Sequence, residues 1–310
     1  MAMAVAPDVV GGTTVKVSVV ICTYRPEMLG HTQDAIESIL TQTYPRLECI
    51  VVVDGSEALF KQLQRQYADD DRTKLLMNER TRGLLTSRNR GAAAASGDVV
   101  AFIDDDAVAD EQWIERLVAA HRREGALAVG GPMKAMWGGG RPASLPGEFY
   151  WLVGVTHAGF ADGPGEVRNT FGSNLSFRTD VFDRLGGFDT AIGGRKEDGS
   201  LQGWETELCV RLRAETGQGV WYTSDAEVAH KVFAYRTRWS WLLRRAFWQG
   251  YSKRAMEQLV SNAGRAEEGR FLQQLVTVSV PRRVARLVKE PNLPGLTQLV
   301  SLGVLTCSVG

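Results

Sequence analysis

Three consecutive carboxylates, Asp104, Asp105 and Asp106, follow the apolar run 99–103. The length and β-branched content of this run predict a fully buried strand. Because side chains alternate along a strand, we expect Asp104 and Asp106 to point the same way and Asp105 to point away or into the following turn. Two carboxylates aimed past a strand end can bind a hard divalent cation, which in turn can bind a phosphate. The alternative is a solvated turn that caps the following helix.

Strand and helix patterns alternate around this triplet, which predicts an α/β fold with a mostly parallel sheet and right-handed crossovers. In such a sheet, ligands bind beyond the carboxyl ends of the strands. Here those ends carry Thr23, Asp54 and the acidic triplet, so three polar strand ends converge on one crevice. This convergence favours a binding site over a simple cap. We expect strands at 15–22, 49–53, 74–77 and 99–103, and helices at 29–41, at 57–67 and before Gly97.

The second half of the chain alternates less regularly. We expect the polar, glycine-containing stretch 193–203 to be a mobile loop that closes over a pocket. The short strand 228–229 is expected to end at His230. The remaining expected elements are a helix at 111–123, a strand at 127–131, a loop at 138–147, a strand reached through a turn within 168–178, a helix at 204–215 and a strand at 220–222.

Composition excludes wholesale disorder, because 44% of the 310 residues are hydrophobic and 23% are charged. The formal net charge of zero hides an asymmetry: residues 231–290 hold 13 Lys and Arg against 4 Asp and Glu. A basic C-terminal region facing an anionic surface fits this split. The four cysteines have no metal-site spacing, and we expect them to be reduced in a cytosolic setting. No apolar run reaches the roughly 18 residues of a spanning helix, and residues 1–14 are expected to form a loose leader.

Seven motifs follow one another along the chain: VSVVICTYRP (17–26), VVVDGS (51–56), RGLLTSRNRG (82–91), AFIDDD (101–106), GSNLSFR (172–178), GGFD (186–189) and GWETELCVRL (203–212). With this ordered set, the chain resembles the family 2 glycosyltransferases of GT-A fold over roughly residues 15–255, although any one motif alone is weak. The resemblance implies a catalytic domain at 15–230, with a nucleotide-binding half at 15–106 and an acceptor half at 107–230, followed by a helical basic region at 231–310.

A narrower similarity links the segments WLVG (151–154), RNTFGSN (168–174) and QGYSK (249–253) to an archaeal and actinobacterial branch. That branch includes dolichyl-phosphate-linked glucuronosyltransferases.

By resemblance, Asp104 and Asp106 match the Asp-X-Asp pair that binds the ribose and the Mg²⁺ or Mn²⁺ of a sugar nucleotide. A divalent ion would stabilise the charge that develops on the leaving diphosphate. Asp106 is then the expected metal ligand and Asp104 lies nearer the ribose, while Asp105 keeps a capping role beside the nucleotide. Thr23 and Asp54 match positions that contact the base and nucleoside, with Tyr24 and Arg25 next to them.

Arg88 lies at a helix start, which suits a pyrophosphate because free backbone N–H groups point there. An ordinary ion pair with Asp98 or Asp104 is the alternative. The two roles are compatible.

Glu205 matches the acidic residue that acts as general base on the acceptor hydroxyl. The preceding position, usually acidic in the family, is Trp204, and Glu207 remains an alternative base. His230 matches a third metal ligand, and its imidazole would suit Mn²⁺. Asn174 and Trp204 are expected to line the sugar or acceptor pocket.

Residues 236–256 interleave cations with Trp239, Trp241, Phe247, Trp248 and Tyr251. This pattern is typical of an amphipathic helix in a membrane interface, although such a helix can also pack its aromatic rings on the catalytic domain. A second basic cluster follows at 282–289. No nucleic-acid module is recognisable, so we expect an anionic membrane and no nucleic acid as the partner.

The sequence therefore predicts a metal-dependent, inverting glycosyltransferase on the cytoplasmic face of a membrane. Its donor would be a nucleotide sugar, expected to be a UDP-sugar, and its acceptor a lipid-linked saccharide. Two alternatives remain open: a metal-dependent nucleotidyltransferase, and a sugar-nucleotide-binding module without activity, since Trp204 breaks the acidic pair.

Overall fold

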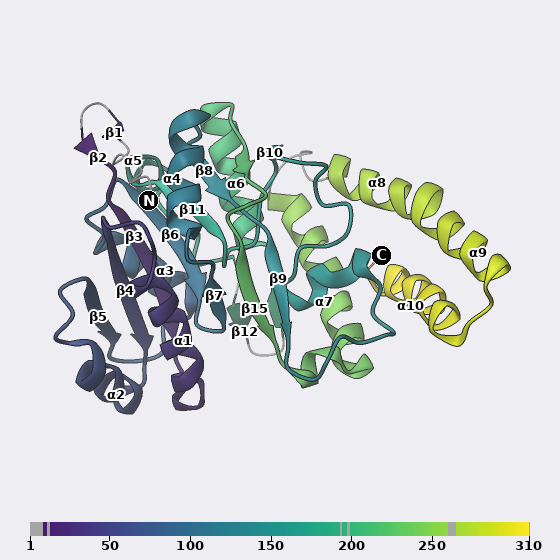
Figure 1. Cartoon of the computed structure of the whole chain (residues 1–310), viewed down its shortest axis with the longest axis horizontal. Coiled ribbons are helices and arrows are strands. Elements are labelled where there is room, and N and C mark those ends of the chain that lie inside the picture. Colours follow the sequence, from purple (N-terminus) through teal and green to yellow (C-terminus); the bar gives the residue numbers. More distant parts are fainter. Residues whose placement is uncertain (1–8, 11–12, 193, 197–198, 260–264, 310) are drawn as a thin grey trace, which may run out of the picture.

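The computed structural model describes residues 9–10, 13–192, 194–196, 199–259 and 265–309 (Figure 1). An eight-stranded sheet forms its centre, with the strand order β10-β14-β8-β11-β6-β3-β4-β5. The strands are β3 (Val17–Thr23), β4 (Leu47–Asp54), β5 (Thr73–Asn78), β6 (Val99–Asp104), β8 (Ala128–Gly130), β10 (Gly165–Val167), β11 (Leu175–Arg178) and β14 (Val220–Tyr222).

The predicted α/β fold with a mostly parallel sheet is confirmed. β3 pairs in parallel with β4 and β6, β4 pairs in parallel with β5, and β14 pairs in parallel with β8. β11 runs antiparallel between β6 and β8, and β10 runs antiparallel at the edge. The carboxyl ends of β3, β4 and β6 therefore lie at one edge of the sheet.

Alternate side chains of the strands pack on opposite faces of this sheet, as the fully apolar runs predict. Val19 and Ile21 of β3 join the core under α1, α2 and α4, whereas Val20 joins the core under α3, α5 and α6. These helices are α1 (Leu29–Leu40), α2 (Glu57–Tyr67), α3 (Leu84–Ala93), α4 (Trp113–Arg123), α5 (Thr179–Arg184) and α6 (Trp204–Thr216), and a 3₁₀ turn (Pro26–Met28) precedes α1.

A second, three-stranded sheet continues from the end of β6, with the order β7-β15-β9. Its strands are β7 (Ala107–Ala109), β15 (Val228–Val232) and β9 (Met133–Trp137). His230 lies in the middle of β15 and not at a strand end, because the pairing with β9 continues to Val232. The register places His230 opposite Ala107, so the imidazole lies beside the acidic triplet.

The C-terminal region is helical, as predicted: α7 (Trp239–Leu259), α8 (Arg265–Gln274), a π-helical turn (Leu275–Ser279), α9 (Val280–Lys289) and α10 (Leu293–Val309). A short 3₁₀ helix (Ala234–Thr237) leads into α7, and another (Gly147–Val153) belongs to the part of the chain before it. Leu242, Leu302 and Leu305 share a buried core with Phe149 and Leu152 of that part. The boundary expected at residue 230 falls inside β15, and the C-terminal helices pack on the part of the chain that precedes them.

Two local expectations change. Within the stretch 193–203, which we expected to be a loop, β12 (Gly194–Lys196) pairs with β13 (Gly199–Leu201), while residues 193, 197 and 198 lie outside the described part of the chain. In the expected leader, β1 (Val9–Val10) pairs with β2 (Thr13–Thr14). Residues 1–8 and 11–12 lie outside the described part of the chain.

All four cysteines are free thiols in the structure; Cys49 and Cys209 are buried, whereas Cys307 is exposed. Among the described helices, none is long and apolar enough to cross a membrane.

Candidate active site

The carboxyl end of β6 and the middle of α3 meet through an ion pair between Asp104 and Arg88. Arg88 donates from Nη2 to Asp104 Oδ1 at 2.5 Å, and its side chain is almost fully buried. Its guanidinium lies over the Trp204 ring, with 4.3 Å between the Arg88 Cζ and the ring centroid. Arg88 Nη1 is buried without a hydrogen-bond partner. A buried donor of this kind is available to a ligand, because leaving it unsatisfied costs free energy.

Asp106 follows Asp104 by two residues and faces the second sheet. His230 Nε2 is 3.4 Å from Asp106 Oδ1, and Arg236 Nη2 donates to Asp106 Oδ2 at 2.9 Å. Arg236 Nη1 is also 3.1 Å from His230 Nε2. Although burial opposes ionisation of this carboxyl group, the contacts with His230 and Arg236 hold the pKa of Asp106 well below its usual range. Asp106 is therefore an ionised, buried carboxylate.

Asp105 does not cap a helix, so that expectation was wrong. β6 ends at Asp104, the next element is β7, and α4 begins only at Trp113 with Gln112 at its N-cap. Asp105 instead lies against the hydroxyl of Thr23, and its Oδ2 is buried without a partner. Burial raises the pKa of Asp105 to about 7, and the charges of its two neighbours add to this effect.

Glu205 lies in the first turn of α6. The side chain is partly accessible, whereas its Oε2 atom is buried and has no hydrogen-bond partner. Burial raises the pKa of Glu205, and the cations Arg88 and Arg245 nearby act in the opposite direction. A carboxylate with a raised pKa and a free oxygen is suited to accept a proton from a bound hydroxyl.

The sequence profile of glycosyl transferase family 2 matches residues 18–186 of this chain, which include β3, α3 and the acidic triplet. The chain belongs to glycosyl transferase family 2. A "Glucosyl-dolichyl phosphate glucuronosyltransferase" of Haloferax volcanii is 45% identical over 296 residues, which is 95% of this chain and 94% of the relative. "Succinoglycan biosynthesis protein ExoM" of Rhizobium meliloti is 27% identical over 243 residues, or 76% and 74% of the two chains.

Solved structures confirm the predicted GT-A fold of this glycosyltransferase. The mannosyltransferase PcManGT from Pyrobaculum calidifontis, in complex with GDP-Man and Mn²⁺, aligns with a TM-score of 0.60 at 16% identity, covering 98% of this chain and 89% of the other. S. aureus TarS 1–349 in complex with UDP-GlcNAc aligns with a TM-score of 0.58 at 15% identity, covering 95% and 82%. At these identities the likeness concerns the fold.

Asp54 shapes the site of the glycosyltransferase through the loop before α3. Asp54 Oδ1 accepts hydrogen bonds from Asn78 Nδ2 at 2.7 Å and from the Arg82 backbone at 2.8 Å, and Oδ2 accepts one from the Gly83 backbone at 2.9 Å. The carboxylate thus fixes the loop that starts the helix carrying Arg88. A nucleoside contact of Asp54 stays a prediction.

Thr23, Tyr24 and Arg25 lie at the end of β3 and just beyond it. Thr23 is buried, and its hydroxyl lies 3.0 Å from that of Thr32. Tyr24 and Arg25 are exposed, with Arg25 Cζ 4.8 Å from the Tyr24 ring centroid. The Tyr24 ring is therefore exposed just beyond the strand end, whereas Thr23 is buried, and contacts of these residues with a nucleotide stay predictions.

The structure does not place Asn174 in a pocket, which corrects that expectation. Asn174 is fully buried, accepts a hydrogen bond from Trp113 Nε1 at 2.9 Å, and donates to the carbonyl oxygens of Ala226 and Pro132. Both ends of the amide are therefore used inside the protein, and Asn174 ties α4 to the segment before β15.

The structure also does not place Glu207 in a sugar or acceptor pocket. Its carboxylate is buried against Arg211, with Arg211 Nε 2.5 Å from Oε1 and Arg211 Nη2 2.7 Å from Oε2. Arg211 donates in turn to the carbonyl oxygens of Leu185 and Gly187. Glu207 is thus neutralised by a structural ion pair, and Glu205 is the candidate base.

Two site residues were not predicted from the sequence. Arg236 bridges Asp106 and His230, and Arg245 on α7 lies close enough to Glu205 to lower its pKa. No sequence signal could have selected them, since 130 residues separate Arg236 from Asp106 and the surrounding segment contains many cations. The signal for Glu207 was readable, because Arg211 follows it at i+4.

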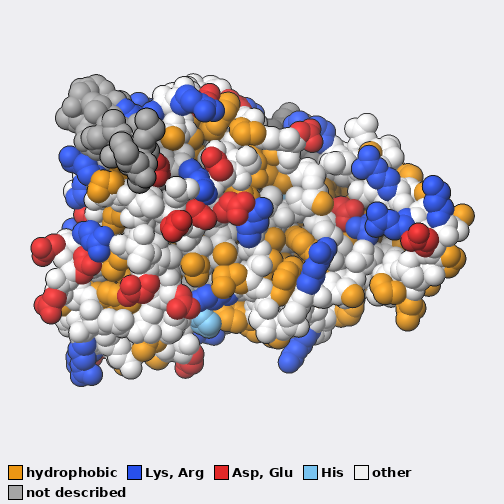
Figure 2. All heavy atoms as spheres, in the orientation of Figure 1, with side chains coloured by type: hydrophobic (Ala, Val, Ile, Leu, Met, Phe, Trp, Pro, Cys, Tyr) orange, Lys and Arg blue, Asp and Glu red, His pale blue; other side chains and the backbone are white. Residues whose placement is uncertain are grey.

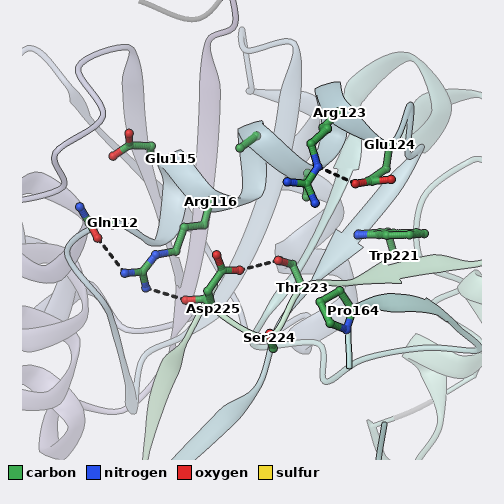
Figure 3. A pocket seen from close by; sticks show the side chains of 12 residues that line it. Gln112, Glu115, Arg116, Arg123, Glu124, Pro164, Trp221, Thr223, Ser224 and Asp225 are labelled. Carbon is green, nitrogen blue, oxygen red and sulfur yellow. Dashed lines mark hydrogen bonds and ion pairs between the residues drawn. The ribbon is translucent and has the colours of Figure 1, made fainter. Parts of the chain in front are cut away.

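A cavity of about 380 Å³ lies between α4 and the segment after β14 (Figure 3). Among its lining residues, Arg116 donates to the backbone carbonyl oxygen of Asp225, and Arg123 forms an ion pair with Glu124 at 2.8 Å. The residues lining this cavity include none of those predicted to form the site. This cavity is therefore separate from the strand ends that carry the predicted site residues.

Proposed function

We propose that this glycosyltransferase transfers a uronic acid from a UDP-linked donor to a hydroxyl of a lipid-linked saccharide, with inversion at the anomeric carbon. Glu205 carries the assignment of the reaction type. Its Oε2 atom is buried without a hydrogen-bond partner, and the charges of the Arg88–Asp104 pair act on its carboxyl group. The name of the Haloferax volcanii relative supports the classes of donor and acceptor.

The residues divide the reaction between them. Arg88, with its unpartnered Nη1, binds a phosphate oxygen of the donor, and Asp104 orients Arg88 and approaches the ribose. Glu205 takes the proton of the acceptor hydroxyl, which then attacks the anomeric carbon as the bond to the diphosphate breaks. Displacement from the face opposite the leaving group inverts the anomeric centre.

A divalent cation, Mn²⁺ or Mg²⁺, fits beside Asp106 and His230. The 3.4 Å between Asp106 Oδ1 and His230 Nε2 allows both atoms to bind one ion, and His230 Nδ1 is buried without a partner. The described residues contain no group of three His, Cys, Asp or Glu side chains suited to a metal, so substrate phosphate and water would complete the shell. Such a cation would neutralise the charge that develops on the leaving diphosphate.

Helix α7 has a buried inner face and an exposed outer face, and the outer face supports a membrane-bound acceptor. The inner face packs Leu242 and Ala246 into the core. The outer face exposes an apolar stripe at every fourth residue: Trp239, Leu243, Phe247 and Tyr251. Aromatic side chains in such a stripe suit the headgroup region of a bilayer, which supports membrane contact by this outer face.

A second apolar surface lies on α9 and α10. Val288 is 76% exposed and Leu293 is 75% exposed. Hydrophobic and basic side chains lie together at this end of the molecule (Figure 2). Arg282, Arg286 and Lys289 are exposed here, whereas Arg283 turns inward to Glu148 at 2.6 Å. We propose that the apolar residues of α7, α9 and α10, with these three cations, contact the cytoplasmic face of an anionic membrane.

Radiolabelled transfer tests the proposal. The full chain is incubated with Mn²⁺, a glucosylated polyprenyl phosphate and one of UDP-glucuronic acid, UDP-glucose, UDP-GlcNAc or GDP-mannose. We expect transfer from UDP-glucuronic acid, loss of transfer on chelation with EDTA, and an inverted product by NMR. Transfer from GDP-mannose alone, or no transfer from any UDP-sugar, would overturn it.

A further inference from the structure

Arg245 lies on the inner face of α7, opposite the segment that leads into α6. Ser252, two turns further along α7, accepts a hydrogen bond from the Gln202 backbone at 2.9 Å, and Gln249 Nε2 contacts Gln202 Oε1 at 3.4 Å. These contacts hold α7 against the start of α6, where Glu205 lies. Arg245 is therefore held beside the candidate base by the fold.

The Arg245 guanidinium has no hydrogen-bond or ion-pair partner within the described part of the chain, and its Nε atom is buried. Its closest aromatic contact is the Trp241 ring, with 6.0 Å between Arg245 Cζ and the ring centroid. Burial lowers the pKa of Arg245 to about 10, so the side chain remains a cation at neutral pH. Four other buried or half-buried arginines pair with carboxylates: Arg88 with Asp104, Arg211 with Glu207, Arg236 with Asp106 and Arg283 with Glu148.

Glu205 does not serve as the missing partner. Arg245 and Glu205 influence each other electrostatically, yet no hydrogen bond joins them and Glu205 Oε2 is itself unpartnered. A buried charge without a partner is costly, and the cost is recovered when a ligand supplies the opposite charge. Two unpaired groups of opposite charge are thus held near each other by α6 and α7.

The charge of Arg236 also acts on Arg245, so Arg245 lies near the Asp106–His230–Arg236 cluster as well as near Glu205. A group bound by Arg245 is therefore near both. In the proposed reaction, the reacting sugars occupy this position. A planar guanidinium binds carboxylate or phosphate oxygens with paired, charge-assisted hydrogen bonds.

We propose that Arg245 binds an anionic oxygen group of the sugar substrates and selects substrates that carry one. The inference rests on the proposed function for the two groups that supply this chemistry: the carboxylate of a uronic acid donor and the phosphate of a lipid-phosphate acceptor.

The first arm of the test measures donor binding. Isothermal titration calorimetry with Mn²⁺ compares UDP-glucuronic acid, UDP-glucose and UDP on the wild type, Arg245→Gln, Arg245→Lys and a control, Arg244→Gln, in which the neighbouring exposed arginine is changed. If the donor carboxylate is the ligand, Arg245→Gln weakens UDP-glucuronic acid about 10- to 100-fold and leaves UDP and UDP-glucose unchanged. Arg245→Lys restores part of the affinity, and Arg244→Gln behaves as the wild type.

The second arm uses water-soluble acceptors: a short-chain glucosyl phosphodiester and the matching neutral alkyl glucoside. If the acceptor phosphate is the ligand, Arg245→Gln raises the KM for the phosphodiester about 10- to 100-fold and leaves the KM for the glucoside unchanged. Direct binding of both acceptors is measured in parallel, so this arm does not depend on turnover.

Preference for an anionic substrate that is lost in Arg245→Gln in either arm supports the proposal and identifies the source of the anion. Equal preference in the wild type and in Arg245→Gln, or no preference in the wild type, overturns it. Because both arms include binding, absence of transfer in the wild type would refute the proposed function without deciding the role of Arg245. Circular dichroism and thermal unfolding confirm that each variant is folded.

Discussion

Arg236 donates from Nη2 to Asp106 Oδ2 at 2.9 Å, and its Nη1 lies 3.1 Å from His230 Nε2. One guanidinium therefore bridges two of the three residues that the sequence predicts as metal ligands, Asp104 being the third. A guanidinium and a divalent cation beside the same two residues repel each other. They therefore compete for Asp106 and His230.

We therefore expect Arg236→Gln to bind Mn²⁺ more tightly than the wild type in the absence of nucleotide sugar. The expected gain is about 10-fold, which corresponds to roughly 1.4 kcal/mol. Electron paramagnetic resonance of free Mn²⁺ during a titration measures this directly. Arg238→Gln, which removes an exposed cation two residues away, serves as the control. Unchanged or weaker Mn²⁺ binding in Arg236→Gln would show that Arg236 does not compete with the ion.

Glu205→Gln tests the assignment of the base. We expect kcat to fall about 10²- to 10⁴-fold, the range typical of a lost general base, while donor affinity stays unchanged. Glu215→Gln is the matched control on the same helix, where Glu215 pairs with Arg184 at 2.8 Å near the surface. A Glu205→Gln variant within a few-fold of the wild-type kcat would contradict the assignment.

The pH profile of the wild type gives a second measure of Glu205. Its pKa is raised by burial, so the fraction of ionised base falls when the pH drops through that raised value. The acid limb of kcat/KM should therefore lie above the ordinary glutamate pKa of about 4.3. The limb should be absent from the residual activity of Glu205→Gln.

The strand ends of the site were predictable from the sequence because the signal is local. An apolar run followed by Asp54, or by Asp104, marks the end of a buried parallel strand, and parallel strands end at one edge. Glu205 and His230 were reached only through the family resemblance. Their distance from the triplet depends on how α6 and β15 pack, which no local pattern encodes.

The misplaced residues show where such reasoning fails. Asn174 lies in a motif beside the site, yet its amide is used by Trp113, Pro132 and Ala226, three partners from distant segments. Asp105 was expected to cap a helix, but the chain enters the short strand β7 instead. Both outcomes depend on tertiary contacts that override the local preference.

His121 provides a test of stability that is independent of the site. It is buried, with Nδ1 2.9 Å from the Ala126 carbonyl oxygen and Nε2 2.9 Å from Ser176 Oγ. Burial lowers the pKa of His121 to about 4. Between pH about 6.5 and 4, the unfolded chain binds a proton on this residue that the folded chain does not bind. This residue's contribution to stability is therefore present above pH about 6.5 and is lost as the pH falls towards 4.

The free energy of unfolding in urea at pH 7, 5.5 and 4.5 measures this effect. We expect His121→Gln to be less stable than the wild type at pH 7, because the ring's packing and hydrogen bonds are lost, and to lose less stability on acidification. The same loss between pH 7 and 4.5 in both proteins would exclude His121 as a source of the acid sensitivity.

The C-terminal surface predicts binding to anionic vesicles. Arg282, Arg286 and Lys289 are exposed beside the apolar side chains of α9 and α10. Each cation near an anionic membrane contributes about 1 kcal/mol. We therefore expect the triple change to Gln to lower the partition coefficient about 100-fold, measured by flotation with vesicles containing phosphatidylglycerol.

A matched triple variant on the catalytic body controls for the loss of charge itself. Lys61, Arg65 and Arg72 are exposed cations on and after α2, at the other end of the molecule from α9 (Figure 1). Changing all three to Gln should leave flotation unchanged. Replacing the exposed Phe247 and Tyr251 by Ser should weaken flotation at both low and high salt, because their contribution is apolar, whereas the cation variant should differ from the wild type mainly at low salt. Equal flotation of the two triple variants would show that α9 does not face the membrane.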